Sequence, residues 1–208
     1  MKKQDQKNML LDQLHKQLSI YGYKKNTSRQ QLWKPFEFGK VAIHLSFINH
    51  LDDFDITVDV GIRFDELEEM KNMNNGLLNQ KEKKQTFSIG TELGNLIVGK
   101  QRRWTIIEES NIENISNSIF SAIKEIAFPY IDKYSIKENV FNDCLSDGEE
   151  SIVLTGIDYV RAMNAVGLAK ILNKVDEIEQ IIEDKTKFLE DKNDFGVSMF
   201  CNFVKTIQ

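Results

Sequence analysis

The spacing of apolar residues changes along the chain, and each change predicts a different secondary structure. From about Asp5 to Tyr21, apolar residues recur every three or four positions, which predicts an amphipathic helix that Gly22 is well placed to end. The following segments alternate between apolar and polar positions and are rich in β-branched residues. This period of two is typical of antiparallel strands that bury one face.

Two strongly alternating segments form the centre of the predicted sheet. They are KVAIHLSF at residues 40–47 and DITVDVGIRF at residues 55–64, each with its apolar side chains on one face. Asp52 and Asp53 lie between them and predict a turn, because aspartate stabilises turns through its own side chain. The sequence therefore predicts a hairpin with one apolar and one polar face.

Weaker strands are expected on either side of this hairpin. Residues 30–38 contain Pro35, which favours an edge strand or a bulge because proline lacks a backbone N–H. Two further strands are expected at residues 85–93 and 102–110. The predicted sheet thus has four to five strands.

Helices are predicted between the strands and after them. The spacing of Asp65 and Glu68 predicts the capping box of a short helix, and Ser110 and Ser135 begin similar boxes. Pro129 is expected to disturb or end the helix that starts near Ser110, since the residue before a proline avoids helical angles. From Ser110 onward the pattern is helical.

The last third of the chain predicts three more helices. Thr155 is expected to cap a helix over residues 156–172 that is apolar or small nearly all round, which indicates a helix packed between others. An amphipathic segment follows at residues 175–189, and residues 195–207 have one more apolar face.

The fold class that follows is α+β. We expect an N-terminal helix, an antiparallel sheet with one face covered by helices, and a helical C-terminal portion. Residues 1–134 would form the sheet domain, and residues 135–208 would form the helical portion, packed on the first as one unit.

Composition narrows the possible classes of function. The 208 residues are 41% hydrophobic and 28% charged, as in ordinary globular proteins, and the formal net charge is -5. Because phosphate binding draws on a surplus of Lys and Arg, nucleic acid is an unfavoured partner. No segment reaches the roughly 20 apolar residues of a membrane span. Cys144 and Cys201 lie far apart and fit a reducing compartment, so a soluble cytoplasmic protein is expected.

Candidate chemistry is concentrated on the polar face of the predicted sheet. Strand parity places His44, Ser46, Asp59 and Arg63 on that face. His44 and His50 lie six residues apart, about 20 Å along a strand, which is too far for two ligands of one metal ion. No cofactor motif is present. We therefore expect no metal, cofactor or catalytic site in this stretch, and interpret the face as a possible binding surface.

A second candidate is the segment GKQRRW, which contains Arg102 and Arg103. The two arginines could bind phosphate and Trp104 could stack on a base, as in a contact with RNA. The favoured alternative is a strand whose tryptophan lies in the core and whose arginines pair with carboxylates.

The order of several short motifs resembles a bacterial family known only as a domain of unknown function. The motifs are GYKKNTSRQQLW, AIHLSF, TVDVGIRF, SIGTELG, RRWTI and AFPYIDKYSIKENV, and they cover roughly the first two-thirds of the chain. The resemblance implies a helix, a curved antiparallel sheet and helices in an intracellular bacterial protein. Because the family has no established activity, it implies no functional residues.

The function expected from these observations is recognition of another protein. A chain without a catalytic constellation and with negative charge fits a non-catalytic binding module, similar to an immunity or adaptor protein, whose partner is basic. Its contact surface would be the polar sheet face with the acidic loop from Asp147 to Glu150. The alternatives are an enzyme in which His44, Asp59 and Arg63 converge on the polar face and, more weakly, an RNA-binding protein.

Overall fold

The structure is a computed structural model that describes residues 2–97, 100–107 and 111–207, without the side chain of Glu150. The chain forms two compact units. Unit 1 consists of Met1–Ile62 and Thr91–Asp132, and unit 2 consists of Arg63–Gly90 and Lys133–Gln208. Each unit is therefore assembled from two separate stretches of sequence. The division predicted at residues 134 and 135 stays a prediction.

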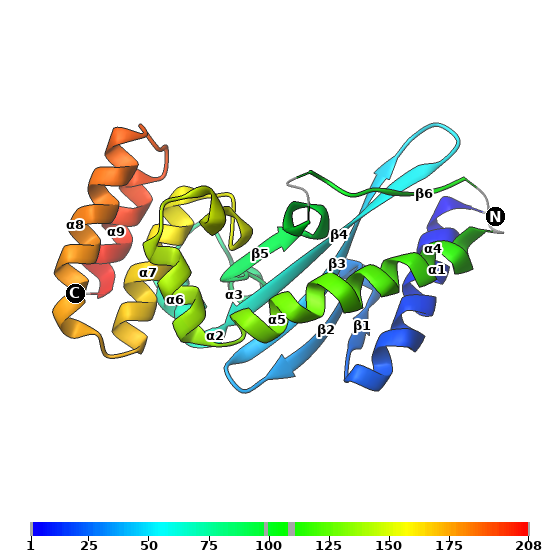
Figure 1. Ribbon diagram of the computed structural model, residues 1–208, viewed down its shortest axis with the longest axis horizontal. Coiled ribbons are helices and arrows are strands. Elements are labelled where there is room, and N and C mark those ends of the chain that lie inside the picture. Colours follow the sequence, from blue (N-terminus) through cyan, green and yellow to red (C-terminus); the bar gives the residue numbers. More distant parts are fainter. Residues whose placement is uncertain (1, 98–99, 108–110, 208) are drawn as a thin grey trace. The chain divides into compact units, whose positions relative to one another are not determined.

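The strands of the described residues form one sheet (Figure 1). Its order is β1-β2-β3-β4-β5, and β6 also pairs with β4. The pairings of β1 with β2, β2 with β3 and β4 with β6 are antiparallel. The strands are β1 (Lys24–Asn26), β2 (Gln31–Phe36), β3 (Gly39–Asn49), β4 (Phe54–Phe64), β5 (Ile89–Glu92) and β6 (Trp104–Ile106).

Helical segments make up most of the remaining structure. The α-helices are α1 (Lys3–Leu18), α2 (Asp65–Asn72), α3 (Gln80–Lys83), α4 (Ile112–Ala122), α5 (Phe128–Tyr134), α6 (Lys137–Leu145), α7 (Asp158–Ile171), α8 (Val175–Asp191) and α9 (Val197–Ile207). The 3₁₀ segments are η1 (Ser19–Tyr21), η2 (Thr27–Arg29), η3 (Leu93–Leu96) and η6 (Glu149–Val153), and η5 (Ile123–Ala127) is π-helical.

The core of unit 1 lies between its helices and the sheet. Helix α1 packs against α4 and contacts β1 and β2. It buries most of the apolar stripe that the sequence predicted, and Gly22 follows in the left-handed conformation, φ 83°, that commonly ends a helix. Leu10, Leu14 and Leu18 of the predicted stripe are buried, together with Leu11, whereas Tyr21 is 40% exposed.

Helix α7 is the centre of unit 2. It packs against α2, α6, α8 and α9, and all residues from Arg161 to Ala169 are buried. This confirms the prediction of a helix packed between others. A Cβ atom at Gly167 would lie 2.4 Å from the Leu67 side chain and 3.5 Å from Phe203, so glycine permits the close approach of α2 and α9.

Strand β2 is not an edge strand, contrary to one of the two readings of Pro35. Strand β1 pairs with Gln31–Trp33, but it is only three residues long. Pro35 lies beyond the end of β1 and pairs with Lys40 of β3 on the other side. The missing N–H of Pro35 is therefore tolerated within an internal strand, because β1 stops before reaching it.

The predicted capping box of α2 is wrong. Phe64 is the N-cap residue, and no side chain caps the helix. The Asp65 carboxylate instead accepts a hydrogen bond from Nε of Arg63 at 2.6 Å. Glu68 is buried, with 1% of its surface exposed, so it does not reach back to the helix start. The charged hydrogen bond from Arg63 therefore takes the Asp65 carboxylate that the predicted capping box would have used.

Two other helices begin later than predicted. Ile136, not Ser135, is the N-cap of α6, and Ile157, not Thr155, is the N-cap of α7. In each case the N-cap residue is the one with extended backbone angles, and neither helix has a side-chain cap. The box predicted at Ser110 lies outside the described residues.

Pro129 disturbs its helix without ending it. Helix α4 passes into the π-helical η5 and then into α5, in which Pro129 is the second residue. A proline lacks an N–H, and its ring clashes with the carbonyl four residues earlier in an α-helix. The wider turn of η5 changes the hydrogen-bond ladder directly before Pro129, so the chain continues as a helix.

The predicted fold class is confirmed: the protein is α+β, with an N-terminal helix, an antiparallel sheet and a helical C-terminal half. Over the described residues, the helices are too short or too polar to cross a lipid bilayer.

Candidate functional site

The structure brings together three of the four residues predicted on the polar sheet face. Oγ of Ser46 donates to Oδ2 of Asp59 at 3.2 Å, and Nδ1 of His44 lies 3.4 Å from the same oxygen. Nδ1 of His44 also lies 3.3 Å from the Ser46 hydroxyl. The His44 and Asp59 side chains are 43% and 40% exposed. The face is therefore polar and in contact with water.

The geometry of this group differs from a catalytic relay. In a relay, serine contacts one ring nitrogen of histidine and the carboxylate contacts the other. Here Ser46 and Asp59 both approach Nδ1 of His44. The contacts join the three side chains of the face in an arrangement other than that relay.

Arg63 does not belong to this group, which corrects the prediction from strand parity. Its residue surface is only 4% exposed, and it belongs to unit 2. Nη1 of its guanidinium donates to the carbonyl oxygens of Lys83 and Thr86, each at 3.0 Å. Parity gives the direction of a side chain from its strand, but not which later segment covers it.

The favoured interpretation of the segment with Arg102 and Arg103 holds for Trp104 and Arg103, whereas the Arg102 guanidinium contacts a ring instead of a carboxylate. Trp104 is buried, with 6% of its surface exposed, and its indole N–H donates to Oγ of Ser118 at 3.0 Å. The Arg102 guanidinium lies 4.7 Å from the centroid of the Trp104 ring. Arg103 approaches the Asp55 carboxylate at 3.4 Å. The ring of Trp104 is therefore engaged within unit 1, where it cannot stack freely on a base.

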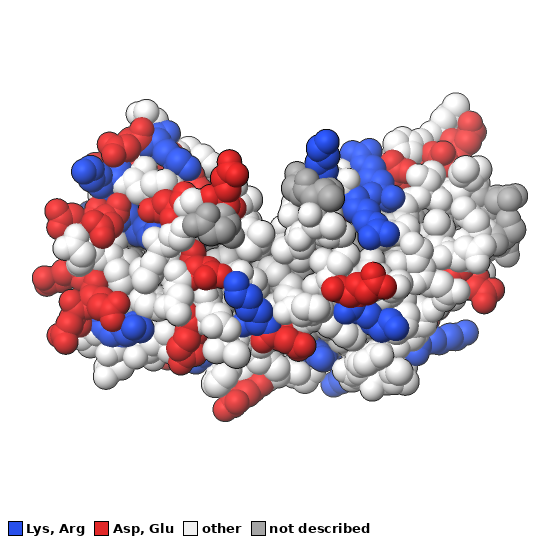
Figure 2. Space-filling model, viewed as in Figure 1, with Lys and Arg blue, Asp and Glu red and all other residues white. Residues whose placement is uncertain are grey.

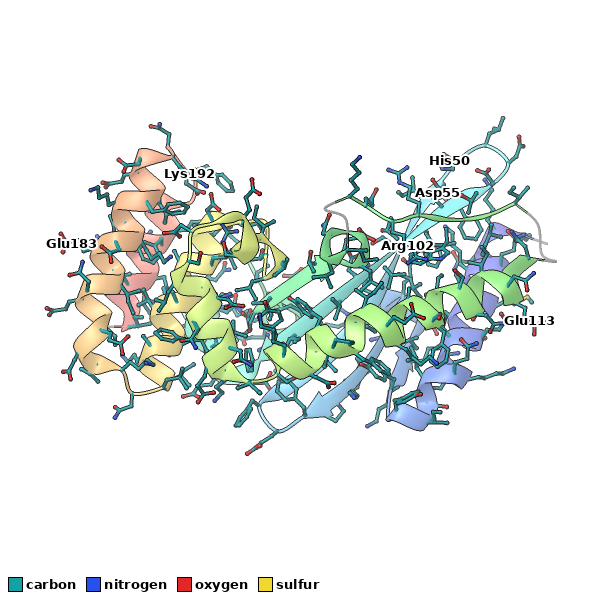
Figure 3. The ribbon with its side chains drawn as sticks, in the orientation of Figure 1. His50, Asp55, Arg102, Glu113, Glu183 and Lys192 are labelled. Carbon is teal, nitrogen blue, oxygen red and sulfur yellow. The ribbon has the colours of Figure 1, made fainter. Side chains whose placement is uncertain are left out.

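Asp55 is the centre of a second polar cluster in unit 1 (Figure 3). Thr105 donates to its Oδ1 at 2.6 Å, and Nε2 of His50 lies 3.2 Å from its Oδ2. The Thr105 hydrogen bond lowers the pKa of Asp55 below its ordinary value; burial opposes this effect, while His50 and Arg103 add to it. His50 thus holds the start of β4 instead of acting with His44.

The acidic loop predicted as a contact surface is partly engaged within unit 2. Nζ of Lys185, whose side chain is 3% exposed, donates to the Asp147 carboxylate at 2.7 Å and to the Leu145 carbonyl at 2.8 Å. The side chain of Glu150 lies outside the description. Asp147 therefore balances a buried ammonium.

Unit 2 contains a pocket of about 520 Å³, a volume typical of sites for small ligands or side chains. Helices α2, α7 and α9 and the residues between α2 and β5 line it. Much of the wall is apolar, with Met70, Leu78, Phe87, Tyr159, Met163 and Phe203 among its residues. The polar part includes Glu68, Lys71, Asn72 and Thr86.

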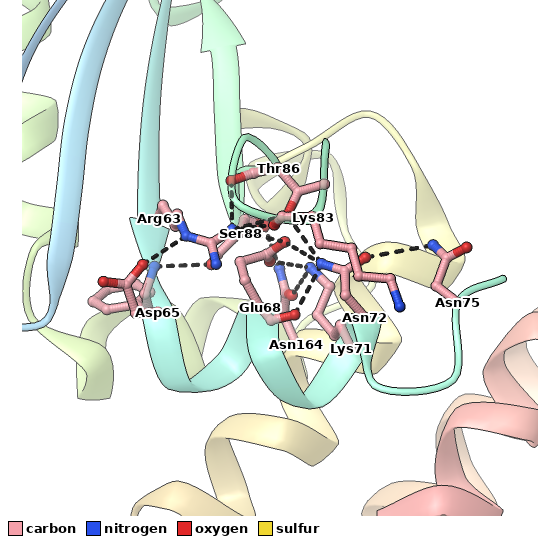
Figure 4. A network of polar contacts seen from close by, with 11 residues as sticks. Arg63, Asp65, Glu68, Lys71, Asn72, Asn75, Lys83, Thr86, Ser88 and Asn164 are labelled. Carbon is pink, nitrogen blue, oxygen red and sulfur yellow. Dashed lines mark hydrogen bonds and ion pairs between the residues drawn. The ribbon is translucent and has the colours of Figure 1, made fainter. Parts of the chain in front are cut away.

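A buried ionic pair lies at the polar side of this pocket (Figure 4). Nζ of Lys71 donates to Oε1 of Glu68 at 2.7 Å and to Oδ1 of Asn164 at 2.9 Å. The side chains of Glu68 and Lys71 are 1% and 10% exposed. Asn164 of α7 in turn donates to the Ser88 carbonyl at 2.7 Å. The pair therefore links α2, α7 and the segment before β5.

The Glu68 carboxylate is held in its charged form. Burial by itself raises the pKa of Glu68, but Lys71, Thr86 and Ser88 lower it more, so the pKa lies below its ordinary value. Asn72 adds a donor 3.4 Å from Oε2 of Glu68. A charged group stays buried only when it is paired in this way.

Sequence reasoning missed this site. Its residues come from three separate segments, at residues 68–87, 159–163 and 199–206, which no local motif connects. Two signals were present: Glu68 and Lys71 have the i, i+3 spacing of a helical pair, and Asn164 is a polar residue within a helix that is otherwise apolar or small nearly all round.

Residues 2–97, 100–107 and 111–207 contain no group of three His, Cys, Asp or Glu side chains placed to hold a metal ion. Cys144 is fully buried, and burial raises the pKa of its thiol to about 12, so it is an inert core residue. No family model, no curated protein and no solved structure matches the chain.

Proposed function

We propose that this chain is a non-catalytic protein-binding module whose unit 2 pocket receives an apolar part of its partner. The observation that carries the proposal is the continuity of the apolar wall with exposed apolar side chains. Leu77 and Met199 both line the pocket, yet they are 84% and 43% exposed. Contiguous exposed apolar surface is typical of sites that another molecule covers.

The distribution of charge supports a basic partner. Unit 2 contains 19 Asp and Glu against 14 Lys and Arg, whereas unit 1 contains 13 of each. Acidic side chains gather over α8 (Figure 2), where Glu183 points away from the helix (Figure 3). The exposed carboxylates of α8 are Asp176, Glu177, Glu179, Glu183, Asp184, Glu190 and Asp191. Complementary charge would speed association and favour basic partners.

The alternative of an enzyme on the polar sheet face has less support. It required His44, Asp59 and Arg63 to converge, and Arg63 is buried in its own hydrogen bonds. We therefore place recognition at the pocket in preference to the polar face.

A pair of matched substitutions tests the proposal. Val160 lines the pocket and is half-buried, so Val160→Trp would fill the pocket, whereas Val175→Trp adds the same bulk at an exposed position on α8. The tagged protein and both variants would be used to capture partners from cells that produce the chain, with circular dichroism as the folding control. We expect a protein that is retained by the wild type and Val175→Trp and lost with Val160→Trp. Equal retention by all three proteins, or no retained protein, contradicts the proposal.

A further inference from the structure

We propose that Asn75 is a site of spontaneous modification, at which the chain itself turns a neutral carboxamide at the unit 2 pocket into a carboxylate. Asn75 lines the pocket in the segment between α2 and α3, and it is the only asparagine of the sequence that is followed by glycine. Its reactivity comes from that pair and from the way the segment folds. The reaction needs only water, so this inference does not rest on the proposed function.

The reaction joins the backbone nitrogen of Gly76 to Cγ of Asn75. The Cγ–Nδ2 bond breaks, and Nδ2 leaves as ammonia with the proton of the Gly76 amide. The product is a cyclic imide that contains Cγ, the backbone carbonyl carbon of Asn75 and the Gly76 nitrogen. Water then opens the ring. Attack at Cγ leaves an aspartyl residue at position 75, and attack at the backbone carbon leaves an isoaspartyl residue.

The first observation is that the Gly76 amide is accessible. Gly76 is exposed, and a Cβ atom there would meet nothing within 4 Å. Among the described residues, its N–H donates to no acceptor. A glycine also carries no side chain that would hinder the approach of its nitrogen to Cγ. The nucleophile is therefore neither covered nor held in a hydrogen bond.

The second observation is the turn that folds the Asn75 side chain back along the main chain. Oδ1 of Asn75 accepts a hydrogen bond from the Leu77 N–H at 3.0 Å. The ring that this hydrogen bond closes contains both Cγ of Asn75 and the Gly76 nitrogen, the two atoms that must join. Negative charge develops on Oδ1 when the nitrogen adds to Cγ, and the Leu77 N–H stabilises that charge.

The third observation is that the leaving nitrogen is weakly held. Nδ2 of Asn75 donates to Oδ1 of Asn72 at 3.4 Å, which is longer than a usual hydrogen bond (Figure 4). Asn117 offers a contrast within the same chain. It is exposed and is followed by a small residue, Ser118, but both residues lie within α4, where the backbone N–H groups bond along the helix. The fold therefore favours modification of Asn75 over Asn117.

The products change the edge of the pocket in two ways. Each adds one negative charge near Leu77, whose surface is 84% exposed. A carboxylate at position 75 has no N–H to donate to Asn72, so two oxygens would face each other in place of the hydrogen bond. The isoaspartyl form also lengthens the main chain by one carbon directly before Gly76, which displaces the apolar side chain that follows.

Incubation of the purified full chain at mildly alkaline pH tests the inference. Peptide mapping by mass spectrometry is expected to show a gain of about 1 Da in the peptide that contains Asn75. The modified peptide should separate into two chromatographic forms, of which the isoaspartyl form is methylated by a protein isoaspartate methyltransferase. The peptide that contains Asn117 should keep its mass.

Matched glycine substitutions assign the reaction to the Gly76 nitrogen. Gly76→Ala should slow the mass change at least about tenfold, because the added methyl group hinders the approach to Cγ. The open space around Gly76 lets this variant fold. Gly156→Ala places a methyl group in equally open space away from Asn75 and should leave the rate unchanged.

The outcomes that would overturn the inference are distinct. An unchanged mass at Asn75 in the folded chain would do so, and a mass change that occurs only in urea would show that the fold protects the pair. An equal rate in Gly76→Ala and the wild type would mean that the Gly76 nitrogen is not the nucleophile. Equal modification of Asn117 would remove the role of the local fold. Partner capture with Val160→Trp judges the proposed function independently.

Discussion

Nζ of Lys3 donates to the carbonyl oxygen of Asp53 at 3.0 Å, which joins the first turn of α1 to the turn between β3 and β4. The same ammonium donates to the carbonyls of His50 and Leu51. Three carbonyl oxygens of one turn thus share a single cation. The Asp53 carbonyl also accepts from the His50 N–H at 3.0 Å, so Lys3 adds a charged donor to a turn that has an internal hydrogen bond of its own.

We expect Lys3→Ala to loosen this turn. The variant loses three charge-assisted hydrogen bonds, two of which are exposed, so the free energy of unfolding should fall by only about 1 kcal/mol. Urea denaturation would measure this change, and amide hydrogen exchange should accelerate around Asp53. Lys2→Ala, which removes an exposed lysine next to it, is the control. Similar effects of the two substitutions would show that the turn does not depend on Lys3.

Gly94 is expected to tolerate no side chain. A Cβ atom there would lie 2.1 Å from the Lys100 carbonyl oxygen and 2.5 Å from the Arg102 nitrogen, and these backbone atoms cannot rotate away. The Glu92 carboxylate fixes the same loop by accepting from the Gly94 and Arg102 amides. Gly94→Ala should lower the free energy of unfolding by about 3 kcal/mol.

Gly156→Ala provides the matched control for Gly94→Ala in thermal and urea denaturation. Its Cβ atom would meet nothing within 4 Å, so the change should stay within about 0.5 kcal/mol. A Gly94→Ala protein as stable as Gly156→Ala would contradict the close approach seen in the structure.

Arg63→Lys should be destabilising although the charge is kept. The guanidinium uses two nitrogens to bind Asp65, Thr86 and the Lys83 carbonyl at once. A lysine ammonium cannot reproduce this fork, so buried acceptors lose their donors at a cost of about 2 kcal/mol. Urea denaturation would compare this variant with Arg29→Lys at an exposed position. Equal stability of the two variants would argue against the network.

The stability of unit 2 should depend on pH through Glu68. Because the folded-state pKa of Glu68 is lowered from 4.5, its contribution is complete above that pH and is lost as the pH falls through the folded value. Glu68→Gln leaves the Lys71 charge unpaired and should destabilise the protein by about 3 kcal/mol at pH 7.

The difference between wild type and Glu68→Gln should therefore shrink as denaturation is repeated below about pH 4. Glu69→Gln, which changes the neighbouring exposed carboxylate, is the control and should show little change at any pH. A difference for Glu68→Gln that is constant with pH would mean that the carboxylate is not charged in the folded protein.

The sequence predicts the elements with long regular patterns. Strands β3 and β4 and helices α1, α8 and α9 have enough apolar positions for their period to be unambiguous. Strand β1 was not predicted, because Lys24–Asn26 is short and polar and exists only through pairing with β2. Helix α3 is four residues long, and Asn79 and Glu82 form its capping box.

Local sequence patterns predict even less of the candidate site than of the fold. Parity correctly grouped His44, Ser46 and Asp59, since these residues lie on adjacent strands of one hairpin. The interaction of Lys71 with Asn164 depends on how α2 packs against α7, a long-range contact that apolar periodicity does not specify. Local periods predict which face of an element is buried, but not which polar group it meets there.

The arrangement of the units decides how binding can be mapped. The chain passes from one unit to the other at Ile62 and Arg63, at Gly90 and Thr91, and at Asp132 and Lys133. A fragment cut at any single position between 63 and 132 therefore takes residues from both units. Loss of binding in such a fragment would report lost folding, so the contact surface has to be located by point substitutions in the full chain.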